Sequence, residues 1–318
     1  MSQLAEPSPA ARPAWRPRKS PLGTRVEAFG LRTLGRLAGR LRAWCGPLKT
    51  EPIAILTWHQ LFDPPTGVKA PAQNVAPRRF EEQLEGLQQR GYHFWSLNRL
   101  IRAANEGEQP PARTIAVTFD DGYESFATRA VPVLQQLSIP ATVFVNTAYL
   151  GSDEPFPFDL WSQEHRARLA ASDYRPMRRE ACLQLAASPL VELGAHTHTH
   201  EDFRGRVPEF RIDLERNLVE LREQFGVERP PLAFPFGSRR QGYVSDELVT
   251  AARELGVSCT LANDGEGVTW GSSPFSWSRF NVFDWDDSAT LAARIDGWFE
   301  RLMNIARRTR QLLRGRIR

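Results

Sequence analysis

Residues 115–145 read IAVTFDDGYESFATRAVPVLQQLSIPATVFV and contain one strand–helix–strand unit. The two ends of this stretch, 115–119 and 141–145, are short runs of mostly apolar residues, which is typical of buried strands. Between them, residues 123–137 have the apolar spacing of a helix. A helix that joins two such strands is the repeating unit of a parallel sheet, so this stretch predicts an α/β fold.

The same alternation of strand and helix continues on both sides of this unit. The expected strands are 53–57, 92–96, 115–119, 141–145, 190–194, 231–234, 257–261 and 278–282. The segments 77–91, 123–137, 208–226 and 245–256 have helical spacing, and several end at or near Gly. Seven or eight repeats favour a closed or nearly closed β/α barrel over an open doubly wound sheet. No GxGxxG or GKT/GKS motif follows a strand, so nucleotide binding has no support.

The composition indicates an ordinary globular protein. Of 318 residues, 41% are apolar and 25% are charged. Cys45, Cys182 and Cys259 are odd in number and fit no CxxC pattern, so we expect reduced thiols that hold no metal. No run approaches the ~20 apolar residues of a membrane helix. The first 19 residues lack the apolar core of a signal peptide, so the expected location is cytoplasmic.

Positive charge is concentrated at the two ends of the chain. Residues 1–50 hold ten Lys and Arg against two Glu, and residues 299–318 hold seven Arg against one Glu. Because the whole chain is +4, residues 51–298 carry a net charge of −10. We expect a basic, partly disordered N-terminal segment with one helix (1–50), a barrel (51–298) and a basic C-terminal helix or tail (299–318). A nucleic-acid partner is not expected, because the body is acidic.

Residues 24–45 predict an amphipathic basic helix that ends at Gly46-Pro47. Its apolar stripe is Leu34, Leu37, Leu41 and Trp44, and another face carries Arg32, Arg36 and Arg40. One interpretation is a helix that packs on the barrel with a solvated arginine face. A second is a helix that lies on an anionic membrane surface, so that the protein associates peripherally with the inner face of a membrane. The third, a helix that binds nucleic acid, is the least favoured.

Catalytic residues of a β/α barrel lie where strands end and loops begin. Asp120, Asp121 and Gly122 directly follow the strand 115–119. Two adjacent carboxylates on a sharp turn point in different directions, so one can bind a metal while the other stays free as a base. The alternative is a common Asp-Asp-Gly turn that caps the next helix.

Half of the six histidines lie within five residues, at His196, His198 and His200, after the strand 190–194. Neutral imidazole is the commonest metal ligand at neutral pH. If the segment is helical, His196 and His200 lie on the same face. If it is extended, all three histidines lie on the same face. The spacing in the sequence does not distinguish these two conformations. One carboxylate with two histidines leaves positions for water and substrate, as metal-assisted hydrolysis requires.

A third motif, Ala233–Gly237 (AFPFG), ends another expected strand. A Pro–aromatic–Gly turn fixes the backbone and can present an N–H to a developing oxyanion. The alternative for this motif is an aromatic turn of the core.

Taken together, the three motifs resemble the polysaccharide deacetylase family, carbohydrate esterase family 4, with its NodB homology domain. The TFDDG motif is matched by Thr118–Gly122, and H-[ST]-x-x-H is matched by His196, Thr197 and His200. The resemblance implies a distorted (β/α)7–8 barrel that releases acetate from an N-acetylhexosamine-containing glycan. It also implies Asp120 as the catalytic base, Asp121, His196 and His200 as ligands of a divalent ion, expected to be Zn²⁺, and the Phe236 N–H as an oxyanion donor. His198 is left outside the metal site.

The chain departs from the family at the general acid. The C-terminal Leu-x-His motif is absent, and no histidine follows His200. Residues 55–59 (ILTWH) resemble instead the Tyr-His element of the poly-N-acetylglucosamine deacetylase branch, with Trp58 in place of Tyr. We therefore expect His59 to be the general acid, against an ordinary histidine at a strand end. Arg279 is expected to orient Asp120 or balance its charge.

Three other functions fit parts of the pattern. An Fe(II) oxygenase also uses two histidines and a carboxylate, but its usual HxD/E…H order is absent. A hydrolase of a non-sugar amide is compatible with the same fold. A non-catalytic protein that binds glycans or membranes is disfavoured by the complete set of base, ligands and acid.

Overall fold

The computed structural model describes residues 21–49 and 52–315 and contains a nine-stranded sheet in which every pairing is parallel. Its strands are β1 (Ile53–Trp58), β4 (His93–Phe94), β5 (Thr114–Phe119), β6 (Ala141–Val145), β7 (Val191–Ala195), β8 (Leu232–Ala233), β9 (Thr260–Ala262), β10 (Trp277–Ser278) and β11 (Phe280–Asn281). All eight predicted strands are present, and the predicted α/β barrel is confirmed.

The barrel is closed by one short segment, residues 277–281. The strand order is β10-β9-β8-β7-β6-β5-β1-β11, and Arg279 alone separates β10 from β11. On one side Trp277 pairs with Leu261 of β9, and on the other Phe280 pairs with Leu56 of β1. The predicted strand 278–282 is therefore split at Arg279, and its two halves join the two edges of the sheet.

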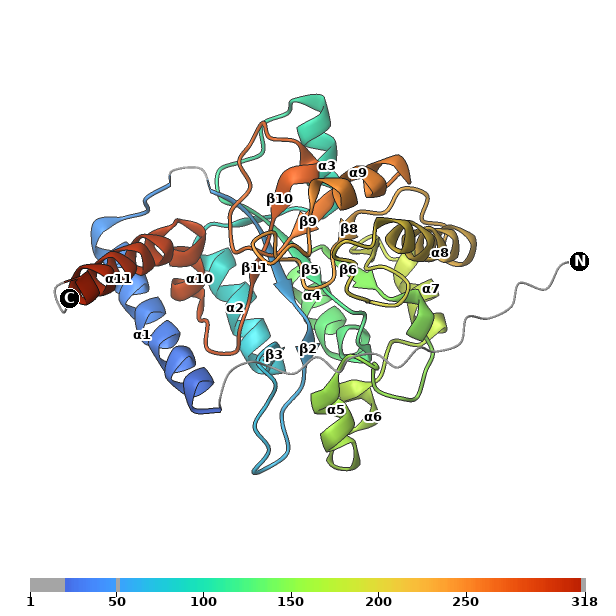
Figure 1. The fold of residues 1–318 in the computed structure, drawn as a ribbon, viewed down its shortest axis with the longest axis horizontal. Coiled ribbons are helices and arrows are strands. Elements are labelled where there is room, and N and C mark those ends of the chain that lie inside the picture. Colours follow the sequence, from blue (N-terminus) through green and yellow to red (C-terminus); the bar gives the residue numbers. More distant parts are fainter. Residues whose placement is uncertain (1–20, 50–51, 316–318) are drawn as a thin grey trace, which may run out of the picture.

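Helices surround the sheet (Figure 1). They are α2 (Pro77–Gln89), α3 (Leu97–Glu106), α4 (Val131–Leu137), α7 (Arg179–Ala186), α8 (Val207–Phe225), α9 (Asp246–Glu254) and α10 (Ser288–Ile295). Of these, α2, α8 and α9 match the predicted ranges 77–91, 208–226 and 245–256, whereas α3, α7 and α10 were not predicted. The predicted helix 123–137 begins instead with a π-helical turn, Phe126–Ala130. Pro132 lies just after this turn and has no N–H for an α-helical bond, which favours the wider turn before it.

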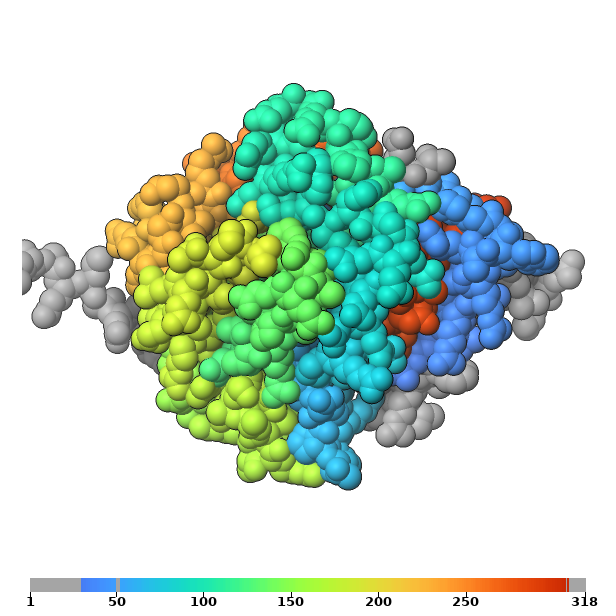
Figure 2. Space-filling model, turned by 180° about the vertical axis from the view of Figure 1, so that it is seen from behind, coloured from blue at the N-terminus to red at the C-terminus, as the bar shows by residue number. Residues whose placement is uncertain are grey.

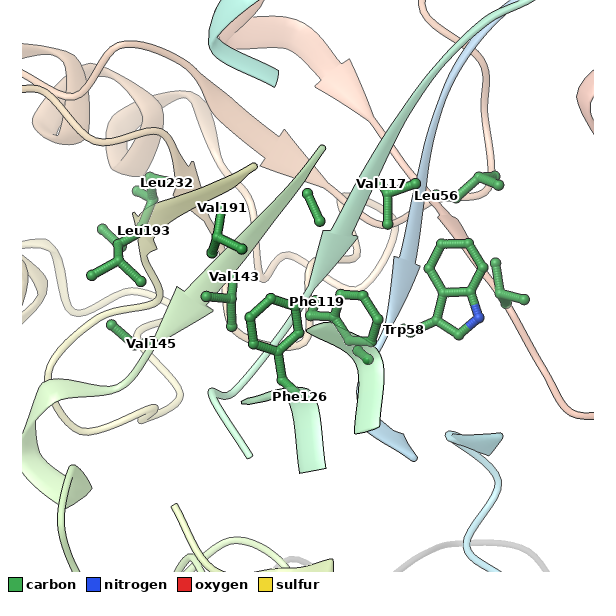
Figure 3. Packing of buried hydrophobic residues seen from close by; sticks show 14 of the residues in the cluster. Leu56, Trp58, Val117, Phe119, Phe126, Val143, Val145, Val191, Leu193 and Leu232 are labelled. Carbon is green, nitrogen blue, oxygen red and sulfur yellow. The ribbon is translucent and has the colours of Figure 1, made fainter. Parts of the chain in front are cut away.

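Both faces of the strands are buried, and this explains their nearly continuous apolar runs. Alternate residues such as Val117 and Phe119 of β5 point to the helix side, where they pack with Trp58 and Phe126 (Figure 3). The intervening positions belong to a second cluster inside the barrel, which includes Ala116. Residue alternation along each strand thus decides which side chains face the barrel interior.

At the carboxyl ends of the strands, two short strands and two short helices form a rim. Strands β2 (Gln60–Leu61) and β3 (Asn74–Val75) pair with each other, and α5 (Leu160–His165) and α6 (Ala171–Tyr174) follow β6. In Figure 1 all four lie at the lower end of the molecule, toward which the β1 arrow points.

Helix α1 (Pro21–Cys45) packs against α10 and α11 (Trp298–Gly315) on one side of the barrel (Figure 1). The docked face consists of small residues: Ala38 is fully buried, and a Cβ atom at Gly35 would lie 2.7 Å from Thr290 Cγ2. Arg42 on the same face pairs with the buried Asp296.

The apolar stripe predicted for this helix is not its docked face. Leu34 and Leu41 are half-buried, whereas Leu37 and Trp44 are exposed at 46% and 89%. The arginines Arg32, Arg36 and Arg40 are exposed. Residues 1–20, where disorder was expected, lie outside the described residues.

Within 21–49 and 52–315, no helix combines the length and apolar content needed to cross a bilayer. The three cysteines are unpaired thiols, as predicted.

Candidate active site

The predicted site residues come from five separate segments and meet at the carboxyl ends of the strands. His59 follows β1, Asp120 and Asp121 follow β5, His196 and His200 follow β7, Phe236 follows β8, and Arg279 lies between β10 and β11. Parallel strands bring their ends to the same edge of a barrel, which is why segments up to 222 residues apart come together here.

The three motif loops share an unusual backbone conformation. Among the described residues, six non-glycine residues have positive φ, and four of them lie in these loops: Asp121 (69°), Thr197 (66°), His200 (57°) and Phe236 (62°). Left-handed conformations cost about 1–3 kcal/mol each outside glycine, and they persist only where the surroundings impose them. Gly122 also has positive φ, and a Cβ atom there would lie 2.9 Å from Val145.

Asp121, His196 and His200 form a compact group of donor atoms. Asp121 Oδ1 lies 3.3 Å from His196 Nε2 and 3.5 Å from His200 Nε2. In the described part of the chain, no other group of three His, Cys, Asp or Glu residues brings its donor atoms within 4.8 Å of one another. All three side chains are buried.

The hydrogen bond of His196 prepares it for a metal ion. Its Nδ1 lies 2.8 Å from the carbonyl oxygen of Ala233. A carbonyl only accepts, so Nδ1 carries the proton and Nε2 has a free lone pair. Two imidazole nitrogens and a carboxylate oxygen are a donor set that suits Zn²⁺. The residues therefore fit a divalent ion.

The histidine loop is neither helical nor extended. Left-handed turns at Thr197 and His200 aim His196 and His200 at Asp121 and turn His198 away. His198 Nδ1 lies 2.9 Å from Thr147 Oγ1, and its ring lines a surface depression of about 420 Å³ beside α8. This geometry resolves the alternatives that spacing leaves open, and it places His198 outside the donor group.

Buried polar side chains hold this loop in place. Asp213 of α8 accepts from the backbone N–H groups of His198 (2.6 Å) and Thr199 (3.3 Å) and from the Thr199 hydroxyl. Asn146, directly after β6, donates to the carbonyl oxygen of His196. Sequence reasoning missed both residues. Asn146 was findable from its place at a strand end, but Asp213 lies within a helix and shows no such signal.

Asp120 is locked against Arg279. The guanidinium donates from Nη1 to Oδ1 at 2.6 Å and from Nη2 to Oδ2 at 2.8 Å, and Arg279 is fully buried. Burial by itself raises the pKa of Asp120. The positive charge of Arg279 and the neighbouring His196 and His59 outweigh it and hold this pKa well below its usual range.

His59 lies beside this pair. Its Nε2 is 3.8 Å from Asp120 Oδ2 and 3.1 Å from the side-chain amide of Gln73. Burial lowers the pKa of His59, and the negative charge of Asp120 opposes this effect. The His59 ring thus lies between the Asp120 carboxylate and Gln73.

Aromatic rings flank the donor group. The ring of His200 stacks on Phe158 at 4.0 Å and meets the ring of Phe236 edge to face at 4.9 Å. Within residues 21–49 and 52–315, the Phe236 N–H has no hydrogen-bond partner. It is therefore available to an oxyanion.

Comparison with known proteins identifies similar deacetylases. Residues 107–260 match the family model described as polysaccharide deacetylase. A poly-beta-1,6-N-acetyl-D-glucosamine N-deacetylase of Staphylococcus aureus strain MRSA252 is 22% identical over 237 residues, which cover 72% of this chain and 74% of that protein. An enzyme of the same name from Escherichia coli K12 is 30% identical over 145 residues, or 45% of this chain and 20% of that protein.

Solved structures share the fold. The Streptococcus pyogenes deacetylase PplD in complex with acetate has a TM-score of 0.62 at 19% identity and covers 78% of this chain and 99% of that chain. IcaB from Ammonifex degensii has a TM-score of 0.62 at 22% identity, over 77% and 98% of the two chains. The family match contains the three motifs, whereas His59 and Arg279 lie outside it.

Proposed function

We propose that this chain is a metal-dependent N-deacetylase of the polysaccharide deacetylase type, which hydrolyses the carbon–nitrogen bond of an N-acetyl group. Its substrate would be a glycan containing N-acetylhexosamine, such as an exopolysaccharide, a cell-wall polymer or a lipid-linked precursor. The observation that carries the proposal is the Asp121–His196–His200 donor group beside an ionised Asp120.

Asp121, His196 and His200 would hold the metal ion, which we propose to be Zn²⁺. When bound, such an ion polarises the acetyl carbonyl and acidifies the attacking water. Asp120 would accept a proton from that water. Arg279 uses one lone pair on each carboxylate oxygen, so a second lone pair remains for the proton. Because Arg279 keeps the pKa of Asp120 below its usual range, the carboxylate is ionised at neutral pH and can accept a proton.

The remaining steps use Phe236 and His59. The free N–H of Phe236 would donate to the oxyanion of the tetrahedral intermediate. His59, protonated, would give its proton to the leaving nitrogen as the carbon–nitrogen bond breaks. The water supplies the new oxygen of acetate, and the sugar leaves as an amine. His59 Nε2 and Asp120 Oδ2 lie 3.8 Å apart, which is close enough for the proposed proton acceptor and proton donor to act on one bound substrate.

Acetate release from a panel of N-acetylhexosamine oligomers, with and without a chelator, tests the function. The panel includes β-1,6-linked N-acetylglucosamine, the polymer in the name of the two relatives. Asp120→Asn should keep the metal and lose about 10²–10⁴-fold in turnover, and His196→Ala should lose both. His93→Ala, which changes an exposed histidine far from the donor group, serves as the control. Full activity of the chelated protein, or of Asp120→Asn, would refute the mechanism.

We further propose that α1 holds the protein loosely at an anionic membrane surface. Trp44 and Leu37 are seven residues apart and therefore lie on one side of α1, and Leu48 just beyond the helix is also 40% exposed. Figure 2, seen from behind, shows this segment at the outer edge of the molecule. Tryptophan favours the membrane interface, and each nearby cation adds up to ~1 kcal/mol, which salt screens.

Vesicle co-sedimentation tests this surface. Anionic but not neutral vesicles should bind the protein, and added salt should weaken the binding. A variant with Leu37→Ser and Trp44→Ser should bind less, whereas Leu183→Ser, at an equally exposed leucine on α7, should not. Equal recovery of the wild type in the supernatant with both lipids would overturn the proposal.

A further inference from the structure

The two histidines of the donor group are held in different ways. His196 Nδ1 lies 2.8 Å from the carbonyl oxygen of Ala233. His200 Nδ1 is buried as well, yet it has no hydrogen-bond partner in the part of the chain that the structure describes. A histidine that binds a metal through Nε2 almost always donates its Nδ1–H to an acceptor, which fixes the orientation of the ring. For His200, a different contact has to do this.

Phe158 makes such a contact. Its ring stacks on the His200 ring, with the centroids 4.0 Å apart and an angle of 24° between the two planes. Phe158 also stacks on the fully buried Phe156, at 4.9 Å and 25°. Rotation of the imidazole about its χ2 axis would drive its edge into the Phe158 ring, and Phe156 limits how far that ring can give way. Stacking therefore restricts His200 where a hydrogen bond does not.

The backbone around Phe158 is fixed on both sides. The N–H of Asp159 donates to the carbonyl oxygen of Phe156 at 3.0 Å and closes a turn around Phe158. The side-chain amide of Gln163 donates to the same carbonyl oxygen, also at 3.0 Å. Asp159 is in addition the N-cap of α5, because its Oδ1 accepts from the N–H of Ser162 at 3.0 Å. The position of the Phe158 ring is thus set by the start of this helix.

The second carboxylate oxygen of Asp159 connects the turn to two other loops of the site. Asp159 Oδ2 accepts from the Tyr123 hydroxyl at 2.9 Å and from Gln60 Nε2 at 3.0 Å. Tyr123 lies two residues after Asp121, and Gln60 directly follows His59. Tyr123 and Gln60 are each 4% exposed. Hydrogen bonds to an ionised carboxylate are stronger than those between neutral groups. One side chain therefore joins the loops of the proposed acid and of a proposed metal ligand to the segment that carries Phe158.

We propose that Phe158 orients the metal ligand His200 by stacking, and that Asp159 holds Phe158 in place for this role. Both are positioning residues, because they act through other side chains. The inference rests on the proposed function, in which His200 binds a divalent ion. It extends that function by assigning part of the metal affinity to an aromatic ring outside the donor group. The ring keeps His200 Nε2 directed at Asp121, 3.5 Å from its Oδ1.

The Zn²⁺ affinity of the full-length protein, measured by chelator competition, tests the role of Phe158. Phe158→Leu keeps an apolar side chain but removes the ring, and it should weaken Zn²⁺ binding by roughly 10- to 100-fold, the range for residues that support a metal ligand. Phe158→Tyr keeps the ring and should restore most of the affinity. Leu160→Ala, at an exposed leucine two residues further along, is the matched control and should bind Zn²⁺ as the wild type does.

The visible absorption of bound Co²⁺ gives a readout that a residue with only a packing role would not change. Co²⁺ binds the same kinds of ligand as Zn²⁺, and its absorption bands depend on the geometry of those ligands. Phe158→Leu should shift these bands, whereas Phe158→Tyr and Leu160→Ala should give the spectrum of the wild type. If Phe158 only packed, its replacement would lower the free energy of unfolding of the metal-free protein and leave both the spectrum and the affinity unchanged.

Asp159→Asn tests the same positioning without removing a ring, and it decides the matter if Phe158→Leu does not fold. An amide in place of Oδ2 turns a donor toward Gln60 Nε2, which is itself a donor. Asp159→Asn should therefore loosen the turn and weaken Zn²⁺ binding by roughly 10-fold. An affinity and a Co²⁺ spectrum equal to those of the wild type would overturn the proposal.

The outcomes separate this inference from the proposed function. Failure of the wild type to bind any divalent ion would overturn the proposed function and this inference with it. If the wild type binds Zn²⁺ and a folded Phe158→Leu matches it in affinity and spectrum, only this inference is wrong. It is also wrong if Phe158→Tyr loses as much affinity as Phe158→Leu, because the ring would then not be what orients His200.

Discussion

Replacing Arg279 by Met should both destabilise the barrel and turn Asp120 into a titrating group. Arg279 is fully buried, Asp120 is 3% exposed, and two charge-assisted hydrogen bonds of 2.6 and 2.8 Å join them. Removing one partner of such a pair leaves a buried charge without compensation, which costs about 3–5 kcal/mol. The methionine fills most of the volume, so the loss is electrostatic rather than a cavity.

The effect has a definite dependence on pH. In the wild type the pKa of Asp120 is lowered, so the carboxylate stabilises the fold above its ordinary pKa near 4, and that contribution is lost as pH falls toward the lowered value. Without Arg279, burial dominates and raises the pKa above the ordinary value. The charged form then destabilises the variant at neutral pH. The stability difference between the two proteins should therefore be largest at neutral pH and shrink as the variant is acidified.

Urea unfolding between pH 4 and pH 8 measures this difference, and the pH–rate profile should gain an acid limb in the variant. Arg78→Met, which breaks an exposed pair with Glu82, should cost no more than about 1 kcal/mol. Asp120→Asn combined with Arg279→Met should cost less than the sum of the single changes, because a neutral amide does not need the guanidinium. A loss for Arg279→Met no larger than that for Arg78→Met, with an unchanged pH profile, would refute the reasoning.

Three further predictions concern the proposed acid, the metal and the histidine loop. His59→Ala should lower turnover and flatten the basic limb of the pH–rate profile. The reason is that burial lowers the pKa of His59, so its protonated form is lost as pH rises. An unchanged pH–rate profile would assign His59 a structural role. Zn²⁺ at about 100 times its Kd should raise the free energy of unfolding of the metal-free protein by about 2.7 kcal/mol in thermal unfolding. His200→Ala should abolish this stabilisation. Equal stabilisation of both proteins would place the ion elsewhere. Asp213→Ala should weaken the affinity for Zn²⁺ by roughly 10- to 100-fold in a chelator competition. The control, Glu215→Ala on the same helix, should leave this affinity unchanged. An unchanged affinity of Asp213→Ala would show that the histidine loop keeps its shape without Asp213.

Much of the fold was readable from short stretches of sequence. A strand buried on both faces needs apolar residues almost without interruption. The strands β1, β5 and β6 therefore appear in the sequence as nearly continuous apolar runs, which are unfavourable in an exposed segment. The donor residues were equally readable, because Asp121, His196 and His200 each lie just after a strand and belong to short, ordered motifs. Properties of this kind depend only on residues within a few positions of one another.

The tertiary structure decided what depends on distant partners. Arg279 meets Asp120 across 159 residues because the segment around it closes the barrel between β9 and β1, and no local pattern marks that closure. Helix α1 docks through Gly35 and Ala38 rather than through its leucine stripe, since only small residues allow its backbone to approach α10 closely. The loop with the left-handed turns at Thr197 and His200 is likewise held by hydrogen bonds to the distant residues Asp213 and Asn146. Short-range pattern therefore determined which elements form and which residues end them, whereas packing and buried hydrogen bonds between distant segments determined how those residues face one another.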